Sequence, residues 1–404
     1  MKAYRKRLIS LATVFGMAAA QLTAASTVGA DRVFAKQESQ KDYNASLFGA
    51  MDREDSYIFS PYSIMDCLTL CYDGLSDKAK KSLAAQGVTE KTVESFKAFD
   101  KQANSGKLSV ANKVYLNKTV KGGFQLDLIR KDSVEEVNMG AQAAKSMNQW
   151  VADKTHNKIQ NLIPEGAVGT DLAMVLINAI YMKRGWLDDG YENEKLTWKN
   201  DKKYKDFSGR ADAGAVRDIG DYSVLRLPYV REQDKKGGVK NAIAMFAITE
   251  NDTIGKKDGE IAPFTPDTAM KYVKAFQKQK APTKYDEVHF HMPSYEINYK
   301  DSVLSALKKI GLGDVLTGGA YKKIGPMQVG EVYHGAYIKT NKNGTEAAAA
   351  TSMMMELTAA PDEKPPVVRE IYFDKPFYFV IQDTVSGIVL FEGKVNADSL
   401  KSAK

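Results

Sequence analysis

The chain has 404 residues, 44% of them hydrophobic, so it is long enough to bury one large core or two moderate ones. Its formal net charge is +7, but residues 1–30 carry four Lys or Arg and no acid, which leaves 53 basic against 50 acidic residues. This near balance argues against a nucleic-acid partner and indicates that the lysines form a solvated surface.

The first thirty residues have the pattern of a secretory signal. Four basic residues between Lys2 and Arg7 precede an apolar stretch from Leu8 to Ala20, and small residues follow up to Ala30. We therefore expect cleavage near Ala30, a secreted extracellular protein, a flexible polar leader over residues 31–42 and a single domain over residues 43–404. The apolar stretch is shorter than the roughly 20 residues that span a bilayer, so no membrane partner is expected.

Two cysteines, Cys67 and Cys71, are spaced i,i+4 in an apolar stretch with helical periodicity. Neighbours on one helix face lie too far apart for an unstrained disulfide. We interpret them as buried core thiols rather than as a redox or metal-binding pair.

The predicted elements change in character along the chain. Helical spacing predicts one helix from Ser63 to Leu75, stopping near Gly74, and another from Ala141 to Ile163, closed by Pro164. Short runs of β-branched and aromatic residues predict strands at Val110–Leu116, Ala173–Tyr181, Tyr222–Leu227, Ala242–Ile248, Val288–Met292, Tyr333–Ile338, Glu370–Phe373, Phe377–Ile381 and Ile388–Val395. Helices come first, hairpins dominate later and no βαβ unit repeats, which favours a mixed α+β domain on antiparallel sheets.

Motifs of the common hydrolases and phosphate-binding enzymes do not occur in the sequence. The histidines are His156, His289, His291 and His334. His289 and His291 alternate with Phe290 and share a strand face that a metal could use, but no third ligand is evident nearby. We assign no catalytic residue and expect neither a metal nor a cofactor.

The segment from Gly344 to Pro361 suits two conformations. With a period of two, one face carries Ala347, Ala349, Thr351, Met353, Met355 and Leu357, the pattern of a half-buried strand. Its small, Ala-rich composition suits a helix equally well, and it runs into Pro361, Asp362, Pro365 and Pro366. It is therefore a candidate for movement between an exposed loop and a sheet, with a surface helix as the alternative.

Seven separated stretches from about Tyr43 to Asn396 resemble the serpin family in the correct order. They are Ile58–Ile64, Leu108–Tyr115, Asn148–Ile159, Leu176–Tyr181 with Gly185 and Trp186, His291–Tyr295, Gly344–Thr351, and Lys375–Phe379 with Leu390–Val395. The resemblance implies about nine helices, three mainly antiparallel sheets and an exposed reactive loop at about residues 342–366. It also implies a suicide inhibitor of serine proteases rather than an enzyme: the protease cuts the loop, forms an acyl-enzyme, and is trapped when the loop inserts into the main sheet.

The resemblance also implies roles for individual residues. The hinge of the reactive loop corresponds to Gly344, Thr345, Glu346, Ala347, Ala348, Ala349, Ala350 and Thr351, with Glu346 facing outward. The shutter, a polar group under the opening sheet, corresponds to Ser60, Ser63, Asn178 and His334, and the breach, where insertion starts, to Trp186. One departure is that Lys342 and Ser294 stand where the family commonly has an acid and a Lys, so that ion pair is missing.

The family spacing places the reactive bond at Thr358-Ala359, with Met355 and Leu357 as alternatives. No Lys or Arg occurs from Thr345 to Glu363, so a trypsin-like pocket finds no charge to pair with. We expect a monomer that targets an elastase-like or subtilisin-like protease, with chymotrypsin-like enzymes also allowed. The alternative is a non-inhibitory serpin that acts as a carrier, chaperone or storage protein.

Overall fold

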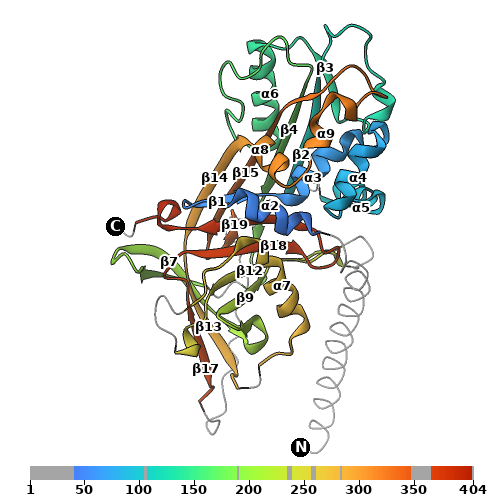
Figure 1. Cartoon of the computed structure of the whole chain (residues 1–404). Coiled ribbons are helices and arrows are strands. Elements are labelled where there is room, and N and C mark those ends of the chain that lie inside the picture. Colours follow the sequence, from blue (N-terminus) through green and yellow to red (C-terminus); the bar gives the residue numbers. More distant parts are fainter. Residues whose placement is uncertain are drawn as a thin grey trace, which may run out of the picture.

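The computed structural model describes residues 41–103, 107–188, 191–233, 239–255, 261–282, 284–346 and 365–402. Over this part the chain folds into helices and stacked sheets, with α2 to α5 and α6 gathered in one half of the molecule (Figure 1). The α-helices of the described part are α2 (Tyr43–Met51), α3 (Pro61–Leu68), α4 (Asp77–Ala85), α5 (Glu90–Ala103), α6 (Ala141–Lys154), α7 (Ala269–Lys278), α8 (Leu304–Lys309) and α9 (Gly313–Leu316). The expected secretory signal and most of the leader lie outside the described residues.

The largest sheet, called the main sheet below, has seven strands. Its path runs β3-β2-β4-β15-β16-β5, and β14 pairs with the other side of β15. The strands are β3 (Val134–Val137), β2 (Leu108–Asn117), β4 (Met174–Met182), β15 (Val329–Asn341), β16 (Gly344–Thr345), β5 (Arg184–Gly185) and β14 (Tyr295–Ser302). The two long central strands β4 and β15 are parallel neighbours.

A second, six-stranded sheet is antiparallel throughout and is called the central sheet. Its strand order is β1-β19-β18-β12-β9-β8. The strands are β1 (Tyr57–Phe59), β19 (Val389–Val395), β18 (Phe377–Asp383), β12 (Ile243–Glu250), β9 (Tyr222–Pro228) and β8 (Val216–Ile219). The middle strands are buried along nearly their whole length, which explains their continuous apolar sequences.

The third sheet, called the edge sheet, has the order β17-β13-β7-β6. It comprises β17 (Val368–Tyr372), β13 (Glu287–Pro293), β7 (Lys203–Asp212) and β6 (Glu192–Thr197), and a separate ribbon pairs β10 (Glu232–Gln233) with β11 (Val239–Asn241). β17 lies at the margin of this sheet and pairs in parallel with β13.

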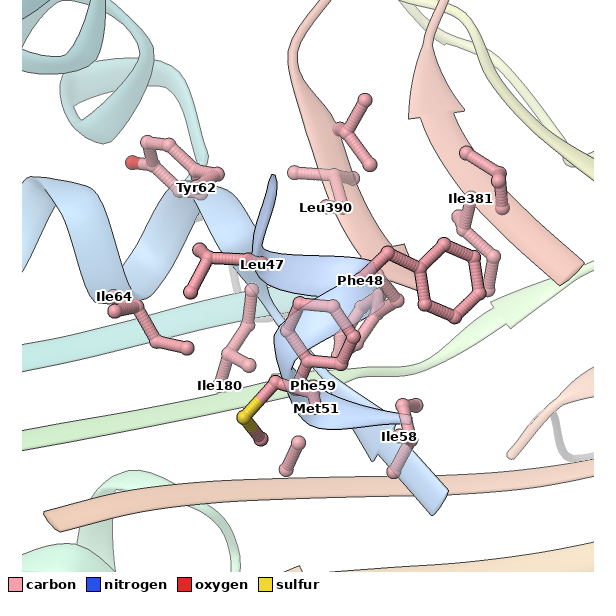
Figure 2. Close-up of a cluster of buried hydrophobic side chains, with 14 of the residues drawn as sticks. Leu47, Phe48, Met51, Ile58, Phe59, Tyr62, Ile64, Ile180, Ile381 and Leu390 are labelled. Atoms are coloured by element: carbon pink, nitrogen blue, oxygen red, sulfur yellow. The ribbon is translucent and has the colours of Figure 1, made fainter. Parts of the chain in front are cut away.

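The apolar core lies between the helices and the sheets. Figure 2 shows one part of it, where Leu47, Phe48 and Met51 of α2 pack beside Phe59 of β1 and Leu390 of β19. A second cluster lies on the other face of the main sheet, where Met147 and Val151 of α6 cover β2 and β4. The main sheet is therefore buried on both faces, and any strand that joined it would be buried as well.

The predicted α+β class and each predicted strand are confirmed, with boundaries shifted by a few residues. The predicted helix over Ser63–Leu75 divides instead into α3 and a 3₁₀ helix, Thr69–Gly74, whose interior Cys71 departs from helical geometry. Both cysteines are free and buried, as expected for core thiols. In the described residues we find no helix with the length and apolar character needed to cross a membrane.

The predicted helix over Ala141–Ile163 is wrong in its second half, because α6 ends at Lys154. His156, Asn157 and Asn161 have left-handed backbone angles (φ 51°, 60° and 50°), which end the helix. Ile159 and Leu162 nevertheless pack in the same cluster as α6, so the apolar spacing predicted burial correctly but not the conformation.

Candidate functional site

The four predicted shutter residues lie together where the N-terminus of α3 packs against β4 and β15 at the centre of the main sheet. Ser60 caps the N-terminus of α3, where its Oγ accepts a hydrogen bond from the backbone N–H of Ser63 (3.1 Å). Asn178 of β4 and His334 of β15 are direct register partners across the parallel pair. All four side chains are fully buried.

Hydrogen bonds join these four residues and fix the state of His334. The backbone N–H of Ser60 donates to Nε2 of His334 (3.1 Å), so Nδ1 carries the proton and donates to Oδ1 of Asn178. The Asn178 amide donates in turn to Oγ of Ser63. Burial lowers the pKa of His334 to about 3, so the imidazole is neutral at physiological pH.

The network continues into residues that the sequence analysis did not assign to the shutter. Asn112 of β2 accepts hydrogen bonds from Asn178 and from Ser63, and donates to Oδ2 of Asp66 (2.7 Å). Arg130 then bridges Asp66 and Asp100, with N–O distances of 2.7 and 2.8 Å. Burial, together with the nearby Asp66, raises the pKa of Asp100. Asn112 lies in one of the stretches that resemble the serpin family, so the sequence offered a signal for it. No motif in the sequence predicts that Asp66 and Arg130 form an ion pair.

The hinge begins inside the main sheet. Gly344 pairs with Asn341 of β15 and with Gly185 of β5, and Thr345 pairs with Thr340 and Arg184. A Cβ atom on Gly344 would lie 2.2 Å from the carbonyl oxygen of Arg184, and its φ of 128° also requires glycine. The first two hinge residues therefore already form a short strand, β16, between β15 and β5.

Side-chain contacts of Thr345 and Trp186 fix the position of this short strand. The buried hydroxyl of Thr345 hydrogen-bonds with the hydroxyl of Tyr229 (2.6 Å). Trp186 stacks on the Tyr229 ring at 4.5 Å and donates from Nε1 to the carbonyl oxygen of Asn341 (2.9 Å). Trp186 is thus placed next to the hinge, where the resemblance put the breach.

The chain leaves the main sheet at Glu346. Its φ of 50° turns the backbone away from β15, while its N–H still donates to the carbonyl oxygen of Lys339 (2.7 Å). In the intact protein the side chain of Glu346, which the resemblance expects to face outward, is 11% exposed and forms an ion pair with Lys158 in the segment after α6. Tyr181 also hydrogen-bonds to this carboxylate. In the described part of the hinge, Glu346 and Lys158 therefore form an ion pair, whereas positions 342 and 294 hold Lys and Ser and form none.

The remaining predicted hinge residues, Ala347 to Thr351, lie outside the described part of the chain. So do the residues of the predicted reactive bond, Thr358 and Ala359, and its alternatives Met355 and Leu357.

His289 and His291 do share one face of β13, as predicted, and a single carboxylate, Glu370 of β17, contacts both rings at 3.1 Å. Within the described ranges no set of three or more His, Cys, Asp or Glu residues is arranged to hold a metal ion.

These features define a class of protein: an α+β domain in which a short strand, β16, lies at one end of the parallel pair β4 and β15, and a buried polar network joins that pair to α3. A family model described as Serpin (serine protease inhibitor) matches residues 38–397. The chain belongs to the serpin family, and this membership supports a protease inhibitor rather than an enzyme.

Relatives from several kingdoms are similar over most of the chain. Serpin-Z1C of Triticum aestivum is 27% identical, covering 84% of this chain and 89% of its own. Serpin B4 of Homo sapiens is 25% identical, with coverage of 85% and 94%. Among solved structures, the thermophilic serpin Tengpin in the native state has a TM-score of 0.67 at 20% identity (88% and 92% covered), and serpin-12 of Manduca sexta has 0.69 at 20% (89% and 98%). The structural similarities support the fold.

Proposed function

We propose that the protein is a secreted suicide inhibitor of serine proteases that traps its target by inserting the cleaved reactive loop between β4 and β15. The observation that carries this proposal is the position of β16, which pairs antiparallel with β15 and β5 at one end of the parallel pair, where an inserted strand would begin. Cleavage of the loop beyond Leu357 would free the segment between β16 and the cut, and this segment could then extend β16 in the same direction. Secretion rests on the N-terminal signal pattern alone.

The register of β16 predicts where each inserted residue would lie. Thr345 is buried toward the core, so in an inserted strand the two-residue alternation would put the odd-numbered positions 347 to 357 on the core side. If the pairing of Thr345 with Thr340 and Arg184 continued in the same register, Thr351 would lie opposite both His334 and Asn178. Those two residues are themselves register partners, so the two ladders agree. The one polar side chain of the inward set would therefore meet the polar shutter.

Insertion would also improve the pairing of the main sheet. The parallel contact between β4 and β15 would be replaced by two antiparallel ladders, which are slightly more stable per residue. The small side chains of Ala347 and Ala349 suit the first inserted positions, because they can pass between packed strands with little opening. These points favour an inhibitor over a carrier, chaperone or storage serpin.

The sequence around the reactive bond supports an elastase-like or subtilisin-like target. Thr358 and Ala359, or the alternatives Met355 and Leu357, are small or medium uncharged residues. A protease with a buried carboxylate in its specificity pocket would leave that charge unpaired, so trypsin-like enzymes should be poor targets. Chymotrypsin-like enzymes remain compatible with Met355 or Leu357.

The decisive experiment mixes the mature protein with pancreatic elastase and follows the products on a denaturing gel. We expect a covalent band heavier than either component, and we expect Thr345→Arg to abolish it and give only cleaved protein. The reason is that Arg at this buried position would place an unpaired charge between the strands. The matched variant Thr345→Val keeps the size of the side chain and should retain the covalent band.

Two outcomes contradict the proposal. Cleavage of the wild type without any covalent band would favour a non-inhibitory serpin. Equal trapping by the wild type and by Thr345→Arg would show that trapping does not use insertion at the hinge. Stoichiometric inhibition of trypsin with elastase unaffected would overturn the predicted target class.

A further inference from the structure

β17 is the strand that follows the reactive loop, and it is held in the edge sheet by one neighbour, β13. A cluster of titratable side chains lies across this junction. Glu287, His289 and His291 come from β13, and Glu370 comes from β17, where it is the register partner of His289.

Glu370 is shared between the two imidazole rings. Its Oε1 lies 3.1 Å from Nδ1 of His289, and its Oε2 lies 3.1 Å from Nε2 of His291. The His291 ring also stacks on Tyr372 of β17, with centroids 4.4 Å apart and planes 7° from parallel. Both histidines of β13 therefore contact β17 directly.

The other nitrogen of His289 lacks a partner that suits the neutral ring. Nε2 is buried without a hydrogen bond, and Oε2 of Glu287 lies 3.5 Å from it. If the proton of the neutral ring is on Nδ1 and is donated to Glu370, Nε2 can only accept a hydrogen bond. The Glu287 carboxylate beside it is also an acceptor, so the two cannot form a hydrogen bond. Protonation would give Nε2 a hydrogen to donate to Glu287.

Several charged side chains lie on the same face as the two rings. On the same face, β7 places Arg210 opposite His289 and Asp212 opposite Glu287, and β6 places Glu192 opposite Ser208, the β7 partner of His291. With Glu287 and Glu370 this gives four carboxylates against one guanidinium while the rings are neutral. Two added protons would reduce that excess of negative charge and turn the contacts with Glu370 into charge-assisted hydrogen bonds.

We propose that Glu287, His289, His291 and Glu370 form a proton-dependent clamp that holds β17 more firmly on β13 as the pH falls through the range in which histidine gains charge. The effect of this clamp on loop insertion follows from the sheet topology and rests on the proposed function. The uncut loop is tied to the main sheet at β16 and to the edge sheet at β17. It can insert fully without cleavage only if β17 leaves β13, so the clamp would slow self-inactivation in mildly acidic surroundings.

The clamp is tested by hydrogen exchange of the intact protein at pH 7.5 and 5.5, comparing protection factors for the amides of Val368–Tyr372. For the wild type we expect roughly fivefold higher protection at pH 5.5, the scale of partly exposed ion pairs. The double variant His289→Gln/His291→Gln should show no such rise. His156→Gln, which removes a histidine outside the edge sheet, should behave like the wild type, and the amides of β2 provide an internal reference.

This readout does not require inhibition, so it separates the clamp from the proposed function. A wild type without the rise, or a double variant that retains it, overturns the clamp even if elastase is trapped. The second measurement is the rate at which uncut protein loses trapping activity at 37 °C. A rate that falls at pH 5.5 in the wild type but not in the double variant supports the link to insertion, and equal rates at both pH values refute that link.

Discussion

Glu392 lies in β19 in the interior of the central sheet, paired with Phe59 of β1 and Val380 of β18. The residue is fully buried, and within the described chain neither carboxylate oxygen has a hydrogen-bond partner. Burial raises the pKa of Glu392 well above its usual range, and the nearby Asp42 raises it further. The folded protein therefore keeps this carboxyl protonated under conditions in which the unfolded chain releases the proton.

The raised pKa gives stability a defined dependence on pH. Below the pKa of the unfolded chain, about 4.3, both states are protonated and the group contributes no penalty. As the pH rises from there toward the folded pKa, the folded state loses about 1.4 kcal/mol per pH unit relative to the unfolded state. Glu392→Met should therefore raise the thermal midpoint of the intact protein, and by more at pH 8 than at pH 4.5.

The control for this prediction is Glu136→Gln, a change of an exposed carboxylate on β3. Differential scanning calorimetry of the three proteins at both pH values measures the effect. A Glu392→Met midpoint that is unchanged or lowered at pH 8 would mean that the carboxyl has found a partner that offsets its burial.

At the scale of elements, the strands were predictable because their residue types and two-residue alternation are local properties. β4, β12 and β18 read as β-branched and aromatic runs in the sequence and are buried along their length in the structure. The end of α6 was not predictable in this way, because its apolar spacing continues to Ile159 and Leu162. Residues with left-handed backbone angles follow Lys154, and the chain after them still packs on the same cluster. The spacing of apolar residues alone does not distinguish this non-helical segment from a continued helix.

The candidate site shows the same division. The family resemblance in the sequence identified the shutter residues Ser60, Ser63, Asn178 and His334, and the structure brings their side chains together. It did not name Asp66, Arg130 or the contact of Glu346 with Lys158, because each joins residues from different elements with no shared motif. The order of β16 between β15 and β5 likewise depends on tertiary pairing.

The shutter gives a prediction at the scale of strands. An inserted Thr351 would place a hydroxyl between His334 and Asn178, whose mutual hydrogen bond must break when β4 and β15 separate. Thr351→Val keeps the shape but leaves these buried groups unpaired, at a cost of about 1–3 kcal/mol. More of the cleaved molecules should then release the protease, so the number of inhibitor molecules consumed per elastase should rise several-fold.

Thr351→Ser is the matched variant, because it retains the hydroxyl and should inhibit with nearly wild-type stoichiometry. Titration of elastase with each variant gives the ratio directly. Equal ratios for the Val and Ser variants would rule out the register that places Thr351 at the shutter.

For the whole molecule, the closed pair β4 and β15 is covered on one face by α6 and the segment after it, and on the other by the main core. An added strand would enter a buried environment, with Met353, Met355 and Leu357 on its inward side. Each such side chain contributes roughly 1.5–3 kcal/mol when buried, and the new ladders add further hydrogen bonds. The form with an exposed loop would then persist because the barrier to insertion is high, not because it is the most stable state.

Cutting the loop without trapping a protease tests this view of the molecule. A catalytic amount of a metalloprotease such as thermolysin, which forms no acyl-enzyme and so cannot be trapped, should nick the reactive loop. The nicked wild type should then unfold at a midpoint raised by roughly 10–15 °C, as expected for a gain of order 10 kcal/mol in a large domain. Nicked Thr345→Arg should show little rise, because its hinge is blocked, and this separates insertion from any effect of the cut itself. If the nicked wild type melts where the intact protein does, the freed segment has not joined the main sheet and the intact fold is already the most stable arrangement of this chain.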